Sequence, residues 1–288
     1  MTAVSTLAGI VLLGIALNDV FHTLLRPAST GRLTTLVFRA VWSLSRRRRP
    51  LAVGGPLTIL ATIGAWILLI TLGWALIYLP HFPDGFSYSG VDPGDYHPFL
   101  ESVTYSLVAL TTLGLGDVVP AAPVIRLLSP LEALTGFVLL SASVSWFMQI
   151  YPALARRRAL AIELTSLHSS GFTELSVTVS AGYAASVVSS VARLVTELTA
   201  DLVQSNEIFY FTERDERLSA PRAIGYAMEL RDGALRSHDG DLRAAGALLA
   251  QVMDELARVL IEQYPHITGE STDDVLRAVA GSHGHRLA

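Results

Sequence analysis

The chain has 288 residues, of which 51% are hydrophobic and only 16% are charged, with a formal net charge of -4 and no cysteine. Soluble domains carry about a quarter charged residues, so this composition indicates a membrane protein rather than a conventional soluble enzyme. The absence of cysteine excludes disulfide scaffolds and thiolate metal sites, and the acidic balance argues against a nucleic-acid binder.

Three stretches of the sequence are long and apolar enough to cross a bilayer, which takes roughly 20 helical residues. They cover residues 4–25, 56–79 and about 124–151. The first stretch has no basic residue ahead of it and no small-residue cleavage pattern after it, so we interpret it as a retained helix rather than a secretory signal.

Polar residues gather near the end of the first predicted span, at Asn18, Asp19, His22 and Thr23. Asp19 and His22 are spaced to pair, which would give a proton-sensitive contact. The alternative is a polar patch that packs against the next span. The segment that follows, residues 34–44, has a helical apolar period and is predicted to lie along the inner membrane surface.

Arginines set the predicted orientation, because basic loops stay on the cytoplasmic side. Seven arginines lie between the first and second spans, and three more follow the third at 156–158. The connection at 81–98 holds three aspartates and no arginine. We therefore expect a protein of the cell (inner or plasma) membrane with its amino terminus outside and its carboxy terminus in the cytoplasm.

A shorter apolar stretch, residues 99–111, has about half the length of a span and is predicted to enter the membrane without crossing it. The sequence Thr112-Leu-Gly-Leu-Gly-Asp117 follows it. Extended backbone at membrane depth is tolerated only where it is buried in protein or lines a water-filled path. Glycines at alternate positions permit positive φ angles, which turn successive carbonyls the same way and create a cation site. Asp117 places negative charge at the outer mouth.

This unit resembles the potassium-channel signature Thr-Val-Gly-Tyr-Gly-Asp, and its Gly-Leu-Gly form is similar to the second filter of two-pore-domain potassium channels. The resemblance covers residues 99–150, with the second span as the outer helix. It implies that dehydrated K⁺ binds the backbone carbonyls and the hydroxyl of Thr112. Because one chain supplies one loop, it also implies a homotetramer. The residues implied to bind K⁺ are Thr112, Leu113, Gly114, Leu115 and Gly116.

Two departures from the signature leave an alternative open. Leu115 replaces the tyrosine whose hydroxyl braces many filters, and Leu113 replaces the valine. A non-selective cation channel on the same scaffold is therefore the second hypothesis. A membrane signalling protein with a vestigial pore is the third.

The third span is predicted to be the inner, pore-lining helix. We expect it to begin at Pro123 and to kink near Pro130. Glu132, within this span, is interpreted as a helix cap or a support for the filter. Gly136 is either a gating hinge or a site of close helix packing. Counting helical turns from Gly136 assigns three further residues to the pore face, with the last as a constriction: Leu140, Ser143 and Phe147.

From about residue 159 charged residues return, and two apolar stripes with a helical period predict a cytoplasmic helical bundle that helps assembly. One stripe runs from Tyr183 to Leu202 and the other from Leu242 to Val259. His283 and His285 near the end are interpreted as a disordered tail in preference to a metal site.

The predicted fold is an all-α membrane protein with three transmembrane helices, a re-entrant pore helix and filter between the last two, and a cytoplasmic helical domain. The predicted domains are an extra helix with its amphipathic linker (1–54), a pore domain (55–155) and the cytoplasmic domain (156–288).

The predicted function is passive potassium conduction, gated at the filter or inner helix. No nucleophile–base pair or phosphate loop suggests an enzyme. No cofactor is expected, and K⁺ is the permeant ion. The expected partners are membrane lipids and three further copies of the chain, with no nucleic acid.

Overall fold

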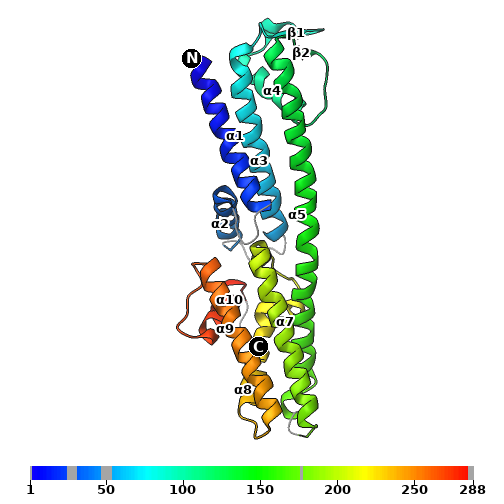
Figure 1. The fold of residues 1–288 in the computed structure, drawn as a ribbon, viewed down its shortest axis with the longest axis vertical. Helices are drawn as coiled ribbons and strands as arrows, with labels where there is room; N and C mark the ends of the chain where they lie inside the picture. The colour runs from blue at the N-terminus through cyan, green and yellow to red at the C-terminus, as the bar shows by residue number, and fades with distance from the viewer. Residues whose placement is uncertain (1, 25–30, 47–53, 176–177, 285–288) are drawn as a thin grey trace. The chain divides into compact units, whose positions relative to one another are not determined.

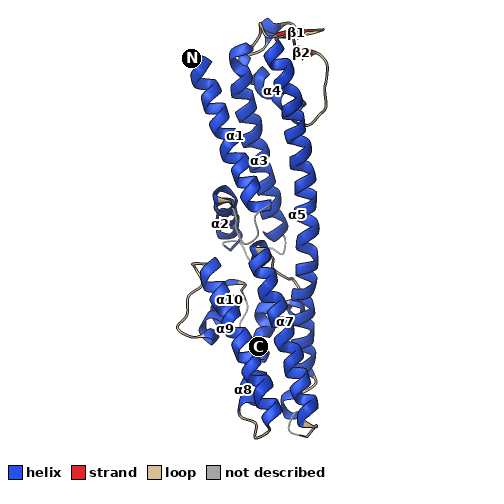
Figure 2. Ribbon diagram, in the orientation of Figure 1, coloured by secondary structure: helices blue, strands red, loops and turns tan. Residues whose placement is uncertain are grey.

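The computed structural model describes residues 2–24, 31–46, 54–175 and 178–284, most of which are helical (Figures 1 and 2). The chain divides into two compact units. One holds Met1–Arg39 and Thr58–Met148, and the other holds Ala40–Leu57 and Gln149–Ala288.

Three helices are long and apolar enough to span a membrane, as predicted. They are α1 (Thr2–Leu24), α3 (Gly54–Tyr78), which a 3₁₀ turn η1 (Leu79–His81) continues, and α5 (Pro123–Ser169). The amphipathic helix α2 (Arg32–Arg46) lies between α1 and α3 in the chain.

Helix α5, which contains the predicted inner helix, begins at Pro123, as predicted, but it runs unbroken for 47 residues. The expected domain boundary at 155/156 therefore falls inside a continuous helix. The helix continues because its apolar residues keep a helical period past the predicted span. This period places Ile150, Ala153, Leu154, Leu160, Ala161 and Leu164 in the core of the second unit.

In the first unit, the short helix α4 (Pro98–Leu110) precedes the glycine-rich segment, and a small antiparallel sheet follows it. Strand β1 (Phe86–Tyr88) pairs with β2 (Val118–Pro120), and Tyr88 lies opposite Val118. Figure 1 shows both strands at the same end of the unit as α4. A 3₁₀ turn, η2 (Pro93–Asp95), lies in the connection between β1 and α4.

Asp19 does not form the predicted pair with His22. Its carboxylate instead accepts hydrogen bonds from the first turn of α2 and from the indole Nε1 of Trp66 in α3. The alternative prediction, a polar patch packed against the next span, describes this contact.

The second unit is a helical bundle built on the distal part of α5. Its longest helices are α7 (Ala181–Gln204) and α9 (Gly240–Gln263), which pack along each other, while α8 (Ala220–Leu235) packs on α9. The shorter elements are α6 (Phe172–Leu175), η3 (Asn206–Tyr210), η4 (Glu216–Leu218) and α10 (Thr272–Ser282).

The stripe predicted on α9 is confirmed at Leu242, Ala245, Leu249, Leu256 and Val259, all of which are buried. The stripe on α7 is displaced at its start. Tyr183 is 58% exposed, and the smaller residues Ala184 and Val188 are buried in its place. Small residues allow two helices to approach closely, so the face of α7 with Ala184 and Val188 is buried in place of the face with Tyr183.

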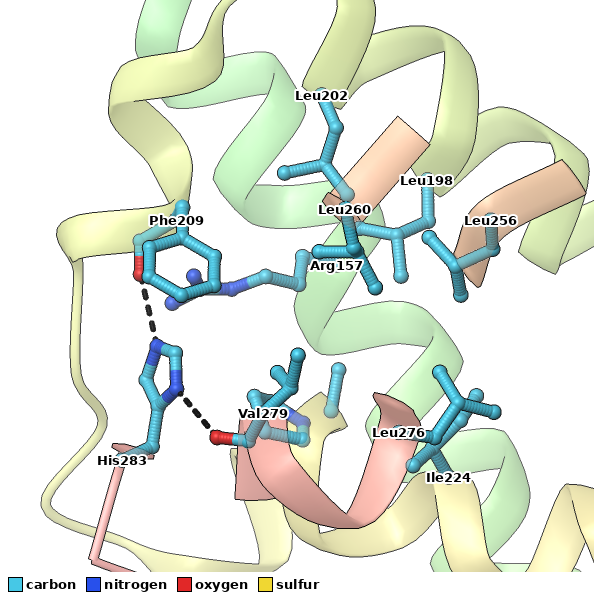
Figure 3. A pocket seen from close by; sticks show the side chains of 12 residues that line it. Arg157, Leu198, Leu202, Phe209, Ile224, Leu256, Leu260, Leu276, Val279 and His283 are labelled. Carbon is cyan, nitrogen blue, oxygen red and sulfur yellow. Dashed lines mark hydrogen bonds between the residues drawn. The ribbon is translucent and has the colours of Figure 1, made fainter. Parts of the chain in front are cut away.

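His283 does not lie in a disordered tail. It is buried, and its ring nitrogens contact the backbone oxygens of Phe209 at 2.7 Å and Val279 at 3.0 Å. Figure 3 shows it at the edge of a small, mostly apolar cavity that the guanidinium of Arg157 enters. His285 lies outside the described residues.

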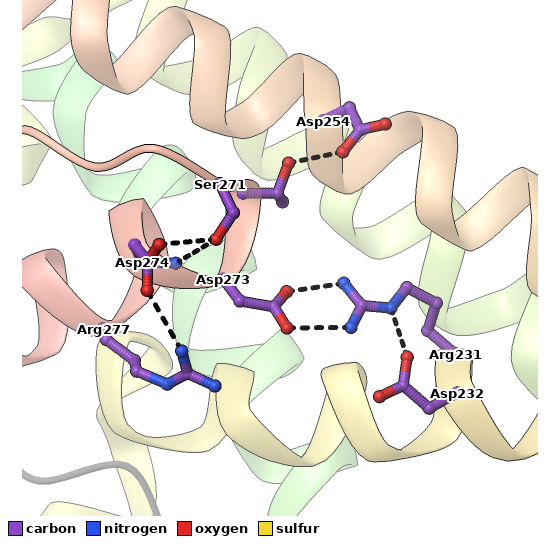
Figure 4. Close-up of polar contacts among 8 residues, drawn as sticks. Arg231, Asp232, Asp254, Ser271, Asp273, Asp274 and Arg277 are labelled. Atoms are coloured by element: carbon purple, nitrogen blue, oxygen red, sulfur yellow. Dashed lines mark hydrogen bonds and ion pairs between the residues drawn. The ribbon is translucent and has the colours of Figure 1, made fainter.

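Ion pairs tie α8 to α10 in the second unit. Arg231 donates to both carboxylate oxygens of Asp273, at 2.7 and 3.1 Å, and to the neighbouring Asp232 (Figure 4). This arrangement lowers the pKa of the Asp273 carboxyl, chiefly through the hydrogen bonds from Arg231.

Candidate ion-binding site

The site begins at the carboxy-terminal end of α4. The His97 side chain caps the other end of this helix, where its Nδ1 accepts from the Phe99 amide at 3.3 Å. At the exit, the amides of Thr112 and Leu113 donate to the carbonyls of Ala109 and Val108, each at 3.0 Å. These bonds anchor the first residues of the glycine-rich segment to the helix.

The backbone of this segment alternates in handedness. Thr112, Gly114 and Gly116 have φ angles of 56°, 60° and 83°, whereas Leu113 and Leu115 between them are not in the positive-φ region. Such alternation turns successive carbonyls toward the same side of the chain. Positive φ is costly for a β-branched residue such as Thr112, and strain of this kind is typical of functional sites.

The carbonyl oxygens of the segment accept no hydrogen bond from the backbone that the structure describes. No amide in these ranges donates to the carbonyls of residues 112–116. The five residues are also exposed in the protomer. A run of aligned, unpaired carbonyls is the donor set that replaces the hydration shell of a cation. The five predicted ion-binding residues are consecutive in the chain and share this exposed segment.

The end of the segment at Asp117 is fixed by contacts that sequence reasoning missed. The Ser89 amide donates to the Asp117 carbonyl at 2.8 Å, next to the β1–β2 pairing. The Asp117 carboxylate accepts from the Val118 amide at 2.9 Å. The two strands have only three residues each and lie far apart in the chain, so no local sequence pattern predicts that they pair.

Tyr105 is the centre of an aromatic cluster behind the segment. Its ring lies 5.1 Å from that of Tyr78 and 4.8 Å from that of Phe86, centroid to centroid. Its hydroxyl donates to Ser129 Oγ on α5 at 2.7 Å. The Tyr105 hydroxyl thus braces α4 against α5.

Leu115 lies beside a cavity of about 290 Å³ in the protomer, which is lined by α4 and by the segments before and after it. Glu101 and Asp117 contribute carboxylates to its lining. Leu115, which stands where the potassium-channel signature has tyrosine, contributes no hydroxyl to this lining.

Glu132 is fully buried and links three helices. Its Oε1 is 2.5 Å from Ser106 Oγ on α4, and the same hydroxyl is 3.0 Å from the Thr71 carbonyl on α3. This geometry agrees with the predicted role as a support for the segment.

Gly136 packs directly against the end of α4. A β-carbon at this position would overlap the carbonyl of Leu110. Close packing, one of the two predicted roles, is therefore present at Gly136.

The other residues assigned to the inner pore differ in exposure within the protomer. Leu140 is 65% exposed and Phe147 is half-buried. Ser143 is buried and its hydroxyl donates to the Leu139 carbonyl at 2.7 Å, so its side chain is covered by its own protomer.

Residues 64–151 match a protein-family model described as ion channel. The chain carries an ion-channel domain. The match begins within α3 and includes α4, the glycine-rich segment and the first part of α5. Helices α1 and α2 lie outside the matched residues.

The chain is also similar to YdjJ, an uncharacterized membrane protein of Bacillus subtilis (strain 168), with 25% identity over 171 residues. The alignment covers 57% of this chain and 49% of YdjJ, so the chain spans about half the length of that relative. No solved structure matches the chain. Among the described residues, no group of three or more His, Asp or Glu side chains is placed to hold a metal ion.

Proposed function

We propose that the chain forms a homotetrameric, potassium-selective channel in the cell membrane. In this proposal the carbonyls of residues 112–116 and the Thr112 hydroxyl coordinate dehydrated K⁺. The alternating φ angles of Thr112, Gly114 and Gly116, together with the unpaired carbonyls, are the observation that carries it.

A need for further copies follows from the exposure of the segment. A single strand presents oxygens to one side of an ion only, and unpaired peptide groups cannot face lipid. Four strands around an axis would surround the ion and cover one another. The carboxy-terminal end of α4 would then direct its partial negative charge at the cavity below the filter.

The same proposal assigns the remaining parts of the chain. α4 is the re-entrant pore helix, Asp117 lies at the outer mouth, and α5 is the inner helix with Leu140 and Phe147 toward the pore. The amino terminus is outside, and the second unit is a cytoplasmic domain that supports assembly or regulation. Burial of Ser143 by its own protomer counts against a pore-facing role for that residue.

Cation flux into liposomes that contain the purified protein tests the function. We expect K⁺ and Rb⁺ to enter and Na⁺ to be excluded. Gly114→Ala should abolish flux, because Gly114 has a φ of 60° and open space around it in the protomer, so the substitution acts on backbone conformation. Gly64→Ala in α3 is the matched control, with equal space and no positive φ.

The non-selective alternative is supported by the cavity beside Leu115, because leucine has no hydroxyl with which to brace the filter. Equal permeation of Na⁺ and K⁺ would favour it over the selective channel. Absence of flux in both the wild-type protein and Gly64→Ala would contradict either channel and favour a signalling protein.

A further inference from the structure

Asp19 joins three helices of the first unit. Its Oδ1 accepts from the Leu33 amide at 2.8 Å, and its Oδ2 accepts from the Thr34 amide at 3.1 Å and hydroxyl at 2.7 Å. The same Oδ2 accepts from Trp66 Nε1 at 2.9 Å. A carboxylate from α1 therefore caps the amino terminus of α2, where it satisfies free amides and the helix dipole.

The cap is tightly packed. Thr23 Oγ1 accepts from the Gly31 amide at 3.0 Å and lies 3.0 Å from Thr34 Oγ1. A β-carbon on Gly31 would overlap the Asp19 carboxylate. Asp19 is only 3% exposed. The start of α2 is thus held firmly to α1 and α3.

The faces of α2 within the first unit differ sharply in character. Thr34 and Phe38 are buried against the protein. Arg32, Leu36 and Arg39 are exposed and follow one another at helical spacing, and Leu36 is 63% exposed. Basic residues flanking an exposed apolar side chain are typical of a helix that lies in the headgroup region of a bilayer.

The positive charge of the segment around α2 indicates what binds this face. The sequence from 25 to 55 holds seven arginines and no acidic residue. This segment connects two spanning helices, so it stays next to the membrane at the face where α1 ends and α3 begins. Clusters of this kind attract anionic phospholipids.

We propose that the exposed face of α2, formed by Arg32, Leu36 and Arg39, binds anionic phospholipid headgroups and transmits their presence to the inner helix. The transmitting contact is Trp66, whose indole is held by Asp19 and whose ring lies 5.6 Å from that of Trp146 on α5. Both indoles are buried, at 0% and 5% exposure. Trp146 directly precedes Phe147, so a shift of α2 reaches the proposed constriction through two packed rings.

Lipid binding can be tested by a measurement that does not depend on ion conduction. The full chain in detergent is titrated with phosphatidylglycerol or phosphatidylcholine while thermal unfolding is followed. Phosphatidylglycerol should stabilise at the lower concentration, and Arg32→Gln with Arg39→Gln should weaken that preference roughly fivefold for each arginine removed.

The control removes two exposed arginines from the second unit, Arg193→Gln with Arg258→Gln, whose side chains are 63% and 56% exposed. It should keep the preference. Equal stabilisation by both lipids, or an equal loss in the control, would overturn the lipid site and indicate that another protein surface covers this face.

Transmission to the inner helix rests on the proposed channel function and is tested by K⁺ flux in vesicles with and without phosphatidylglycerol. Wild-type flux should change with the anionic lipid. Trp146→Leu should retain the lipid preference in detergent but lose the lipid dependence of flux. Lipid-dependent flux that persists in Trp146→Leu would refute the transmitting contact.

The two proposals fail in different ways. A chain that binds phosphatidylglycerol in detergent but conducts in no vesicle would contradict the channel and the transmission, while the lipid site would stand. A chain that conducts K⁺ equally in both vesicles would contradict the transmission alone.

Discussion

Single residues behind the glycine-rich segment hold the short helix α4 in place. Ser106, Glu132 and the Thr71 carbonyl connect α4 to α5 and α3, and Tyr105 adds a second link to Ser129. Gly136 allows α5 to approach the last carbonyl of α4 without a side chain between them. Because the segment begins where α4 ends, the contacts that hold α4 also position the carbonyls of the segment.

Substitutions at Glu132 separate its carboxyl group from its hydrogen bond. Glu132→Gln keeps an acceptor for Ser106 and removes a group whose ionised form is costly to bury, so stability should be retained or raised. Glu132→Leu removes the acceptor and should lower the free energy of unfolding by about 1–3 kcal/mol. Thermal unfolding in detergent measures both. A Gln variant as unstable as the Leu variant would show that the carboxyl group itself is required.

Gly136→Ala should destabilise the ion-channel domain by about 1–3 kcal/mol, because the added methyl overlaps the Leu110 carbonyl and α4 must shift. The same substitution should also lower K⁺ flux. Gly233→Ala in α8, where a β-carbon meets open space, is the control and should be neutral or slightly stabilising. Unchanged stability and flux in Gly136→Ala would argue against close packing at this position.

At the scale of elements, the two units are stabilised by different forces. Helices of the first unit present large apolar side chains to the surroundings, as lipid permits, and exposed examples on α1 and α5 include Ile10 and Phe137. In the second unit, apolar stripes are buried between helices, and ion pairs at the surface connect one helix to another. The stability of the second unit should therefore depend on pH through those ion pairs.

The Arg231–Asp273 pair predicts loss of stability in acid. The pKa of Asp273 is lowered by its hydrogen bonds to Arg231, so the folded state favours the ionised carboxyl. The pair contributes its full stability above the ordinary pKa of aspartate, about 4, and loses it as pH falls through the lowered value. Thermal unfolding as a function of pH measures this, and Asp273→Asn should have the lower stability at neutral pH and a smaller loss in acid. An identical pH profile in both proteins would refute the assignment.

At the scale of the whole molecule, the proposed ion binding by the carbonyls depends on assembly. One protomer leaves residues 112–116 exposed, and the proposed tetramer would cover them. Mixtures of wild-type and Gly114→Ala chains test the number of subunits. If one altered strand disables the filter, flux should fall as the fourth power of the wild-type fraction. A linear fall would show that each chain acts alone.

The sequence by itself determined the three spans, the short helix before the glycines and the two long helices α7 and α9. These follow from hydropathy and helical periodicity, which are local properties of the chain. The glycines at 114 and 116 also marked the positions of positive φ, since few other residues adopt that conformation at low cost.

Only the tertiary structure decided the contacts between distant segments. The capping of α2 by Asp19, the β1–β2 pairing and the link from Ser106 to Glu132 join residues at least 14 positions apart, whose partners no local pattern specifies. Of the two alternatives for the polar cluster, the Asp19–His22 pair is not the one formed, because the amides at the start of α2 bind the carboxylate in a site that exists only after α1, α2 and α3 have packed. The length of α5 was likewise set by its burial in the second unit rather than by the thickness of a membrane.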